Sequence, residues 1–218
     1  MNVSEIFTGI NGEGPLAGTI AVFIRLTGCN LDCVYCDTRY AQVCGAGKDY
    51  TLPEILERID PDIKHITVTG GEPLIHSGIG ELLAALADSG KIVSVETNGT
   101  VCPSSVLDMS QQSRPSFIMD YKLPSSGQEK SMDINNFLCL TEKDAVKFVA
   151  GDHGDLERMA HVYRELSGRI RTQFLAGGVF GGIPASDIVR FLIENKLYDI
   201  RFQLQLHKCI WGSDKKGV

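Results

Sequence analysis

Three cysteines stand close together near the start of the chain: Cys29, Cys33 and Cys36 lie at spacings of four and three residues. Grouped thiols are typical of a metal centre, because thiolates bind both zinc and iron–sulfur clusters. Structural zinc sites and [4Fe–4S] clusters each usually take four protein ligands, yet the other four cysteines are scattered singly. The spacing therefore favours a cluster with one iron open to another ligand. A zinc site completed by Cys44 or a histidine is the alternative.

A glycine-rich segment, Thr69-Gly70-Gly71-Glu72-Pro73, follows the next strand-like run. Glycines at the end of a strand allow backbone groups to approach a bound ligand closely. Taken alone, such a segment is more typical of a turn than of a site. Its position one β/α unit after the cysteines favours a ligand-binding loop.

Composition narrows the classes of protein that these motifs can belong to. The chain has 218 residues, 43% of them hydrophobic and 22% charged, which is ordinary globular usage. Its net charge of -6 argues against binding to nucleic-acid backbones. No apolar run is long enough for a membrane helix, and the first residues do not resemble a signal peptide. We therefore expect a cytoplasmic protein whose seven cysteines point to metal binding or catalysis rather than to disulfides.

Strand-like and helix-like segments alternate along the chain, a pattern that predicts a parallel sheet wrapped by helices. The expected strands cover residues 21–26, 65–69, 91–95, 117–120, 145–149, 170–175 and 200–204. The expected helices cover residues 53–59, 79–88, 155–166 and 185–195. The first of these helices begins after Thr51, which has capping-box spacing to Glu54. Residues 45–48 and 177–182 are rich in glycine and are expected to be loops.

This order corresponds to about six β/α units and a closing strand. A complete eight-unit barrel takes about 250 residues, so we predict an α/β fold of the partial, open (β/α)6 barrel type, with a doubly wound sheet as the alternative. Nothing divides the chain, and residues 1–218 are expected to form a single domain.

The two motifs together resemble the radical S-adenosylmethionine (SAM) superfamily. Further segments narrow the resemblance to the 7-carboxy-7-deazaguanine synthase family, over nearly the whole chain. They are residues 6–15 (IFTGINGEGP), 25–31 (RLTGCNL), 37–38 (DT), 96–100 (ETNGT), 120–124 (DYKLP), 146–149 (VKFV) and 205–208 (QLHK). The chain departs from the family at Asn11, where glutamine is usual, and at Tyr35, where tryptophan is common.

The resemblance implies a radical SAM domain and a carbon–nitrogen lyase of the queuosine and deazapurine route. Such an enzyme converts 6-carboxy-5,6,7,8-tetrahydropterin to 7-carboxy-7-deazaguanine with release of ammonia. Its expected cofactors are a [4Fe–4S] cluster, SAM and Mg²⁺, and the open iron of the cluster would chelate SAM. The resemblance also implies a homodimer and a reducing protein such as flavodoxin or ferredoxin, with no nucleic-acid or membrane partner.

The resemblance assigns roles to individual residues. Cys29, Cys33 and Cys36 would hold the cluster, and Thr38 would bind magnesium. Cofactor contacts are expected from Tyr35, Cys36, Asp37, Gly71, Asp120, Tyr121 and Lys122. Substrate contacts are expected from Ile10, Asn11, Gly12, Arg25, Thr69 and His207, with Arg25 on the substrate carboxylate. Glu13, Gln205 and Lys208 lie beside these positions, and the tail after Lys208 is expected to close over the substrate.

Two rival functions share part of the pattern. A glycyl-radical activating enzyme would have the same cysteine spacing and the same Gly-Gly-Glu-Pro loop. The segments at residues 11–14, 37–38 and 205–208 argue against it. A zinc-stabilised binding module without catalysis is the second rival, and metal analysis separates it from a cluster enzyme.

Overall fold

One nine-stranded sheet organises the computed structural model, which describes residues 1–213 and 215–218. The strands, in their order across the sheet, are β3 (Lys48–Asp49), β1 (Asn2–Ile10), β2 (Ile20–Leu26), β4 (His65–Gly70), β5 (Ile92–Thr97), β6 (Ser116–Tyr121), β7 (Ala145–Ala150), β8 (Gln173–Gly178) and β9 (Ile200–Phe202). The run from β2 to β9 is parallel throughout, whereas β1 pairs with β2 and β3 in antiparallel fashion. The predicted open, parallel α/β sheet is confirmed.

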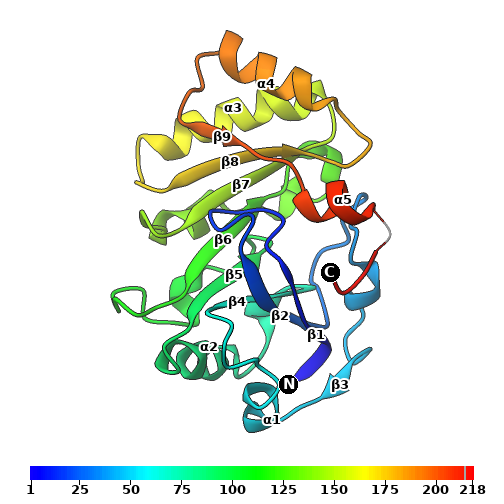
Figure 1. Cartoon of the computed structure of the whole chain (residues 1–218). Coiled ribbons are helices and arrows are strands. Elements are labelled where there is room, and N and C mark those ends of the chain that lie inside the picture. Colours follow the sequence, from blue (N-terminus) through cyan, green and yellow to red (C-terminus); the bar gives the residue numbers. More distant parts are fainter. Residues whose placement is uncertain (214) are drawn as a thin grey trace.

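Five α-helices connect or follow the strands in the described part of the chain. They are α1 (Leu52–Leu56), α2 (Ile79–Asp88), α3 (His153–Ser167), α4 (Ala185–Glu194) and α5 (Leu206–Trp211). α2 packs on β5, α3 on β7, and α4 on β8 and β9. Figure 1 shows these three helices outside the curve of the sheet and the C-terminus beside β1. This arrangement leaves the carboxyl ends of the parallel strands together at one edge.

Apolar side chains at helical spacing explain how the helices attach. Ile79, Leu82, Leu83 and Leu86 of α2 are all buried, which is the i, i+3, i+4, i+7 stripe of a helix that packs with one face. They join a continuous core with the inward-facing residues of the strands. The predicted capping box is present, because the Thr51 hydroxyl accepts a hydrogen bond from the Glu54 backbone amide and the Glu54 carboxylate accepts one from the Thr51 backbone amide. No helix among the described residues has the length and apolar character needed to cross a membrane.

The structure corrects several expected boundaries. The strand expected at 170–175 runs from Gln173 to Gly178 instead, because Arg169 and Ile170 still bond to the Leu166 carbonyl at the end of α3. Gly177 and Gly178 therefore belong to β8, where they pair with Val149 and Ala150, and not to a loop. The helix expected at 53–59 ends at Leu56.

Other elements were absent from the sequence prediction. β1 was not expected, and it forms only because β2 pairs with it along nearly its whole length. α5 was not expected either. The segments after β5 and β6 contain only 3₁₀ turns: η3 (Pro103–Ser105), η4 (Pro124–Ser126), η5 (Glu129–Ser131) and η6 (Ile134–Cys139). Two further 3₁₀ turns, η1 (Arg39–Ala41) and η2 (Pro73–Ile75), follow the cysteine loop and the glycine-rich segment.

Candidate active site

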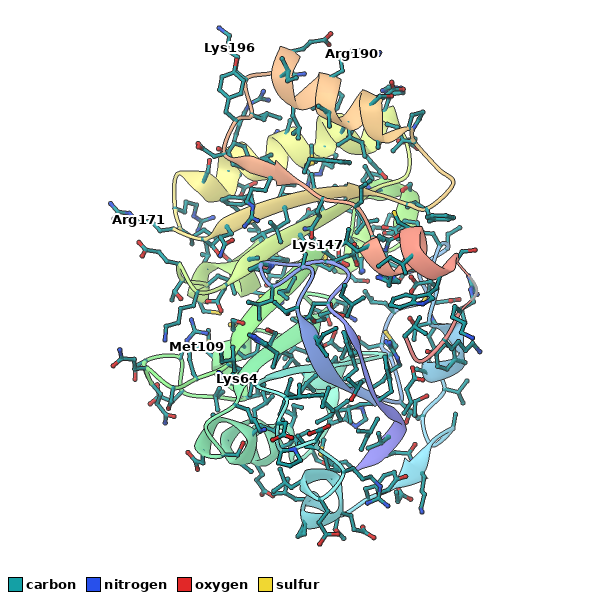
Figure 2. All side chains as sticks on the ribbon, viewed as in Figure 1. Lys64, Met109, Lys147, Arg171, Arg190 and Lys196 are labelled. Atoms are coloured by element: carbon teal, nitrogen blue, oxygen red, sulfur yellow. The ribbon has the colours of Figure 1, made fainter. Side chains whose placement is uncertain are left out.

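A pocket of about 250 Å³ opens at the carboxyl edge of the parallel strands. The cysteine loop, the loop between β1 and β2, and α5 all contribute to its lining. Lys147 of β7 reaches into it from the sheet and lies near the middle of the molecule in Figure 2. Segments from both ends of the chain thus meet over the strand ends.

All three grouped cysteines line this pocket. Backbone bonds shape their loop: Gly28 N donates to Ala41 O at 2.7 Å, and Val34 N donates to Ser126 O at 3.0 Å. Burial raises the pKa of the Cys33 thiol to about 11 and also raises that of Cys29. The free thiols of Cys29 and Cys33 are therefore protonated at neutral pH, and a bound metal group must displace their protons.

The donor set fits an iron–sulfur cluster better than a single ion. Among the described residues, no three His, Cys, Asp or Glu side chains converge tightly enough to chelate one metal ion. In a [4Fe–4S] cube each thiolate binds a different iron, so three sulfurs spread along one wall suit it. Cys44 is exposed and lies outside the pocket lining, behind Gly28. The zinc alternative that borrowed Cys44 therefore lacks its ligand geometry.

Glu72 of the glycine-rich segment ties the cysteine loop to the end of β5. Its side chain is fully buried and accepts bonds from Leu74 N at 2.9 Å, Thr97 Oγ1 at 2.7 Å and Asn98 N at 2.6 Å. Its own backbone N donates to Gly28 O at 2.8 Å. Three bonds to one buried carboxylate brace the segment, so Glu72 supports the site without lining it.

Gly71 lies directly against the cysteine loop. A Cβ at this residue would stand 2.1 Å from Gly28 O, which only glycine avoids. The side-chain amide of Asn98, just after β5, lies 3.7 Å from Cys29 Sγ. The glycine-rich segment, the end of β5 and the first cysteine therefore form one connected unit.

An ionic cluster occupies the sheet side of the pocket. Asp120 Oδ2 lies 2.9 Å from Lys122 Nζ and 3.5 Å from Lys147 Nζ, and Lys147 Nζ lies 3.4 Å from Glu13 Oε2. Burial alone would lower the pKa of Lys147, but Glu13 and Asp120 raise it well above its ordinary value. Asp120 Oδ1 is buried and has no partner among the described residues. The cluster thus offers cations and one free acceptor to a ligand.

A second group of side chains lies toward the pocket mouth. Arg25 Nε bonds to Glu5 Oε1 at 2.6 Å, which also accepts from the Tyr40 hydroxyl at 2.7 Å. Because Glu5 holds only Nε, the two terminal nitrogens of Arg25 are the part of the fork left to face the pocket. The rings of Phe7 and Phe23 stack at 5.0 Å and 7° and also line it.

Two carboxylates of the pocket are likewise held in place. Thr69 Oγ1 donates to Glu96 Oε2 at 3.0 Å. Asp37 pairs with Lys208 at 2.6 Å, and the Thr38 hydroxyl donates to Asp37 at 2.9 Å. Burial lowers the pKa of His207, so its imidazole is neutral at pH 7.

Most of the residues expected from the sequence lie in this pocket. They are Ile10, Gly12, Arg25, Cys29, Cys33, Tyr35, Cys36, Asp37, Thr38, Thr69, Gly71, Asp120, Lys122 and His207, together with Glu13, Gln205 and Lys208. Val218, in the tail expected to close over the site, also lines the pocket and lies against Gly9.

The side chains of Asn11 and Tyr121 do not line the pocket. Asn11 is 5% exposed, donates to Thr19 Oγ1 at 2.8 Å and accepts from Thr67 Oγ1 at 2.7 Å, so it braces the turn between β1 and β2. Tyr121 lies between Asp120 and Lys122, and successive side chains of a strand point to opposite faces. Its ring therefore packs into the core, and its hydroxyl accepts from Arg158 at 3.1 Å.

Sequence reasoning gave no site role to several residues that line the pocket: Phe7, Phe23, Gln42, Glu96, Asn98 and Lys147. Two of them carried a usable signal. Lys147 is a lone charge in a buried apolar strand, and Glu96 lies near the carboxyl end of β5. Phe7 carried none, because its place depends on the pairing of β1 with β2.

Comparison with known proteins adds to this geometry. The model of the radical SAM superfamily matches residues 23–117. The 7-carboxy-7-deazaguanine synthase of Clostridium acetobutylicum is 44% identical, over 99% of this chain and 98% of that protein. The enzyme of the same name from Chlorobaculum tepidum is 38% identical, over 100% and 97% of the two chains.

A crystal structure of QueE from Escherichia coli has the same fold, with a TM-score of 0.72 and 23% identity over 94% of each chain. The sequence matches run the full length of both relatives. The chain therefore belongs to the 7-carboxy-7-deazaguanine synthase family, a family of radical SAM enzymes whose cofactors are a [4Fe–4S] cluster and SAM.

Proposed function

We propose that this enzyme converts 6-carboxy-5,6,7,8-tetrahydropterin to 7-carboxy-7-deazaguanine with release of ammonia. The observation that carries the proposal is that one pocket joins two different kinds of wall. Three cysteines and the Gly71 loop form the first, and Arg25 with the stacked rings of Phe7 and Phe23 forms the second. A cluster-bound cofactor and a flat, carboxylated ring system would meet between these walls.

The chain's own residues have distinct roles toward the cofactors in this proposal. Cys29, Cys33 and Cys36 hold the cluster, and the Asn98 amide near Cys29 Sγ stabilises the coordinated sulfur. Asp120 presents its unpartnered Oδ1 to SAM, while Lys122 keeps this carboxylate ionised and in place. When bound, the reduced cluster and SAM supply a carbon radical that abstracts a hydrogen atom from the substrate.

Toward the substrate, Arg25 supplies a planar fork of donors that suits a carboxylate, and Glu5 sets the orientation of that fork. Phe7 and Phe23 cover the flat ring, and Glu96, oriented by Thr69, accepts from ring nitrogens. His207 closes the site from α5 and, because it is neutral, can both donate and accept a hydrogen bond.

Thr38 is the proposed magnesium ligand. Thr38 lines the pocket and its hydroxyl donates a hydrogen bond to Asp37, so the lone pairs of the hydroxyl oxygen remain available to a cation. Mg²⁺ commonly takes few protein oxygens and completes its shell with water and substrate oxygens. A single threonine at the pocket wall is compatible with this coordination preference.

The remaining expectations are also part of the proposal. Radical SAM enzymes of this kind act on a small molecule and need a reductant, here a flavodoxin or a ferredoxin. We propose that residues 1–218 work as one cytoplasmic domain that forms a homodimer.

The proposal is tested with anaerobically reconstituted protein, dithionite, SAM, Mg²⁺ and the carboxypterin, with the product followed by absorbance and mass spectrometry. We expect the deazapurine and one ammonia per turnover, and neither from the Cys33→Ala variant, which lacks a cluster ligand. Efficient cleavage of SAM without any deazapurine would exclude this substrate while leaving the radical SAM assignment intact.

A further inference from the structure

Two cysteines that have no role in the active site contact each other. Cys102, just before η3, and Cys139, the last residue of η6, place their Sγ atoms 3.4 Å apart. Both side chains are half-buried, and neither lines the active-site pocket. They lie 37 positions apart in the sequence, so only the fold brings them together.

The surroundings connect this thiol pair to the active site. Cys139 Sγ donates to Asn136 O at 3.4 Å. The Asn136 amide in turn donates to Gly99 O at 3.2 Å and to Thr100 O at 3.0 Å. These two residues follow Asn98, whose amide reaches Cys29 Sγ. A series of contacts therefore connects the pair, through Asn136 and residues 98–100, to the first cluster cysteine.

We propose that Cys102 and Cys139 form a reversible disulfide when the enzyme meets hydrogen peroxide, and that this bond straps the loop after β5 to η6. The pair is independent of the reaction proposed above, because it touches neither cofactor nor substrate residues in the pocket.

The chemistry balances in two steps. Cys102 attacks peroxide, becomes a sulfenic acid and releases one water. Cys139 then displaces the hydroxyl from that sulfur, forming the S–S bond and releasing a second water. Peroxide is reduced by two electrons, which the two thiols supply, and a dithiol reductant reverses the change.

The structure also orders the two thiols. Burial and the contact with Cys102 raise the pKa of Cys139 to about 12, so Cys139 is the poorer first nucleophile. The Ser104 hydroxyl lies 3.0 Å from Cys102 Sγ. Cys102 is thus the thiol that peroxide oxidises first, and Cys139 resolves it.

Geometry makes this pair the preferred one. A disulfide bond is about 2.05 Å long, so the sulfurs must close by little more than an ångström from their 3.4 Å contact. Cys44 and Cys209 are exposed, and no Sγ–Sγ contact is found for them among the described residues. Oxidation of those two should therefore lead to sulfenic or sulfinic acid, or to bonds between molecules.

The test uses anaerobically reconstituted enzyme, treated with about one equivalent of hydrogen peroxide, then quenched in acid with N-ethylmaleimide and mapped by peptide mass spectrometry. We expect a linked peptide containing Cys102 and Cys139, which disappears with dithiothreitol. The Cys44→Ser/Cys209→Ser variant should yield the same linked peptide, and Cys102→Ser should yield none. Full alkylation of both cysteines after peroxide, or their pairing with other cysteines, would overturn the proposal.

A second measurement tests the strap itself and needs no variant. A bond that closes a loop of this length should raise the unfolding temperature of the cluster-free full chain by roughly 5 to 15 °C, and dithiothreitol should reverse the rise. An oxidised chain that carries the bond but melts at the temperature of the reduced chain would refute the strap.

Discussion

Gly12 provides the sharpest test of how the substrate end of the pocket is built. It is buried in the loop between β1 and β2, and its carbonyl accepts from Leu206 N at 3.0 Å. A Cβ at this residue would stand 1.9 Å from His207 Nδ1 and 2.9 Å from both Cε1 and Cγ. Since comfortable contacts lie near 3.5 Å, the Gly12→Ala substitution must push the imidazole back by about 1.6 Å.

The size of the effect follows from that displacement. Overpacking of this kind costs about 1–3 kcal/mol of stability, and misplacing a substrate-positioning group by about 1 Å can cost about 10²-fold in rate. We expect the kcat/KM for the carboxypterin to fall about 10²-fold in Gly12→Ala. Cluster absorbance and substrate-free cleavage of SAM should stay within about twofold, because the cysteine wall is untouched.

Three companion variants make the result interpretable. Gly168→Ala is the matched control, since its φ is -78° and nothing lies within 4 Å of the added methyl group. Gly12→Ala/His207→Ala removes the ring that clashes, so the double variant should be no worse than His207→Ala alone. Steady-state kinetics on all four proteins decide the matter. Full activity in Gly12→Ala, or simple additivity in the double variant, would refute the steric reasoning.

Four further outcomes are expected. Cys33→Ala should abolish the iron–sulfur absorbance, and Cys44→Ala should retain it, because only the former thiol lines the pocket; cluster loss in Cys44→Ala would contradict the assignment. Arg25→Lys should raise the KM for the carboxypterin roughly tenfold or more, since lysine keeps the charge and loses the fork, whereas an unchanged KM would remove Arg25 from the site. Thr38→Ala should keep its cluster but weaken the dependence of turnover on Mg²⁺, so a magnesium titration identical to the parent's would show the ligand to be elsewhere. Glu72→Gln replaces an oxygen that accepts from a buried amide or hydroxyl, and should destabilise the cluster-free chain by about 1–3 kcal/mol in thermal unfolding; unfolding at the parent's temperature would show that the bonds to Glu72 do not brace this segment.

Local patterns were enough for much of the fold. α2 occupies the residues that its apolar stripe predicted, and the strands at β4, β6 and β7 lie within a residue or two of their expected ends. β8 was misplaced by three residues at its start, since Ile170 is apolar and β-branched yet finishes a helix turn. β1 was missed because its place in the sheet depends on a partner, β2, that comes later in the chain.

The candidate site was likewise predicted only in part from the sequence. Its chemical groups were recognisable from residue type, spacing and resemblance, and most of them do line one pocket. Asn11 and Tyr121 were expected there because of the family resemblance, but their side chains face a turn and the core. Adjacent residues of extended chain point in opposite directions, so proximity in sequence does not decide which of them reaches a ligand.

The sequence by itself determined most of the strands and helices from β2 to α4 and which three thiols share one loop, because capping, apolar periodicity and spacing act over a few residues. Only the tertiary structure decided that Gly12 meets His207, that Lys147 meets Glu13, and that Cys102 meets Cys139. These contacts join segments far apart in the chain. Pairing between separate strands brings these segments together, and the register and alternation of each strand then choose which of its side chains face a partner.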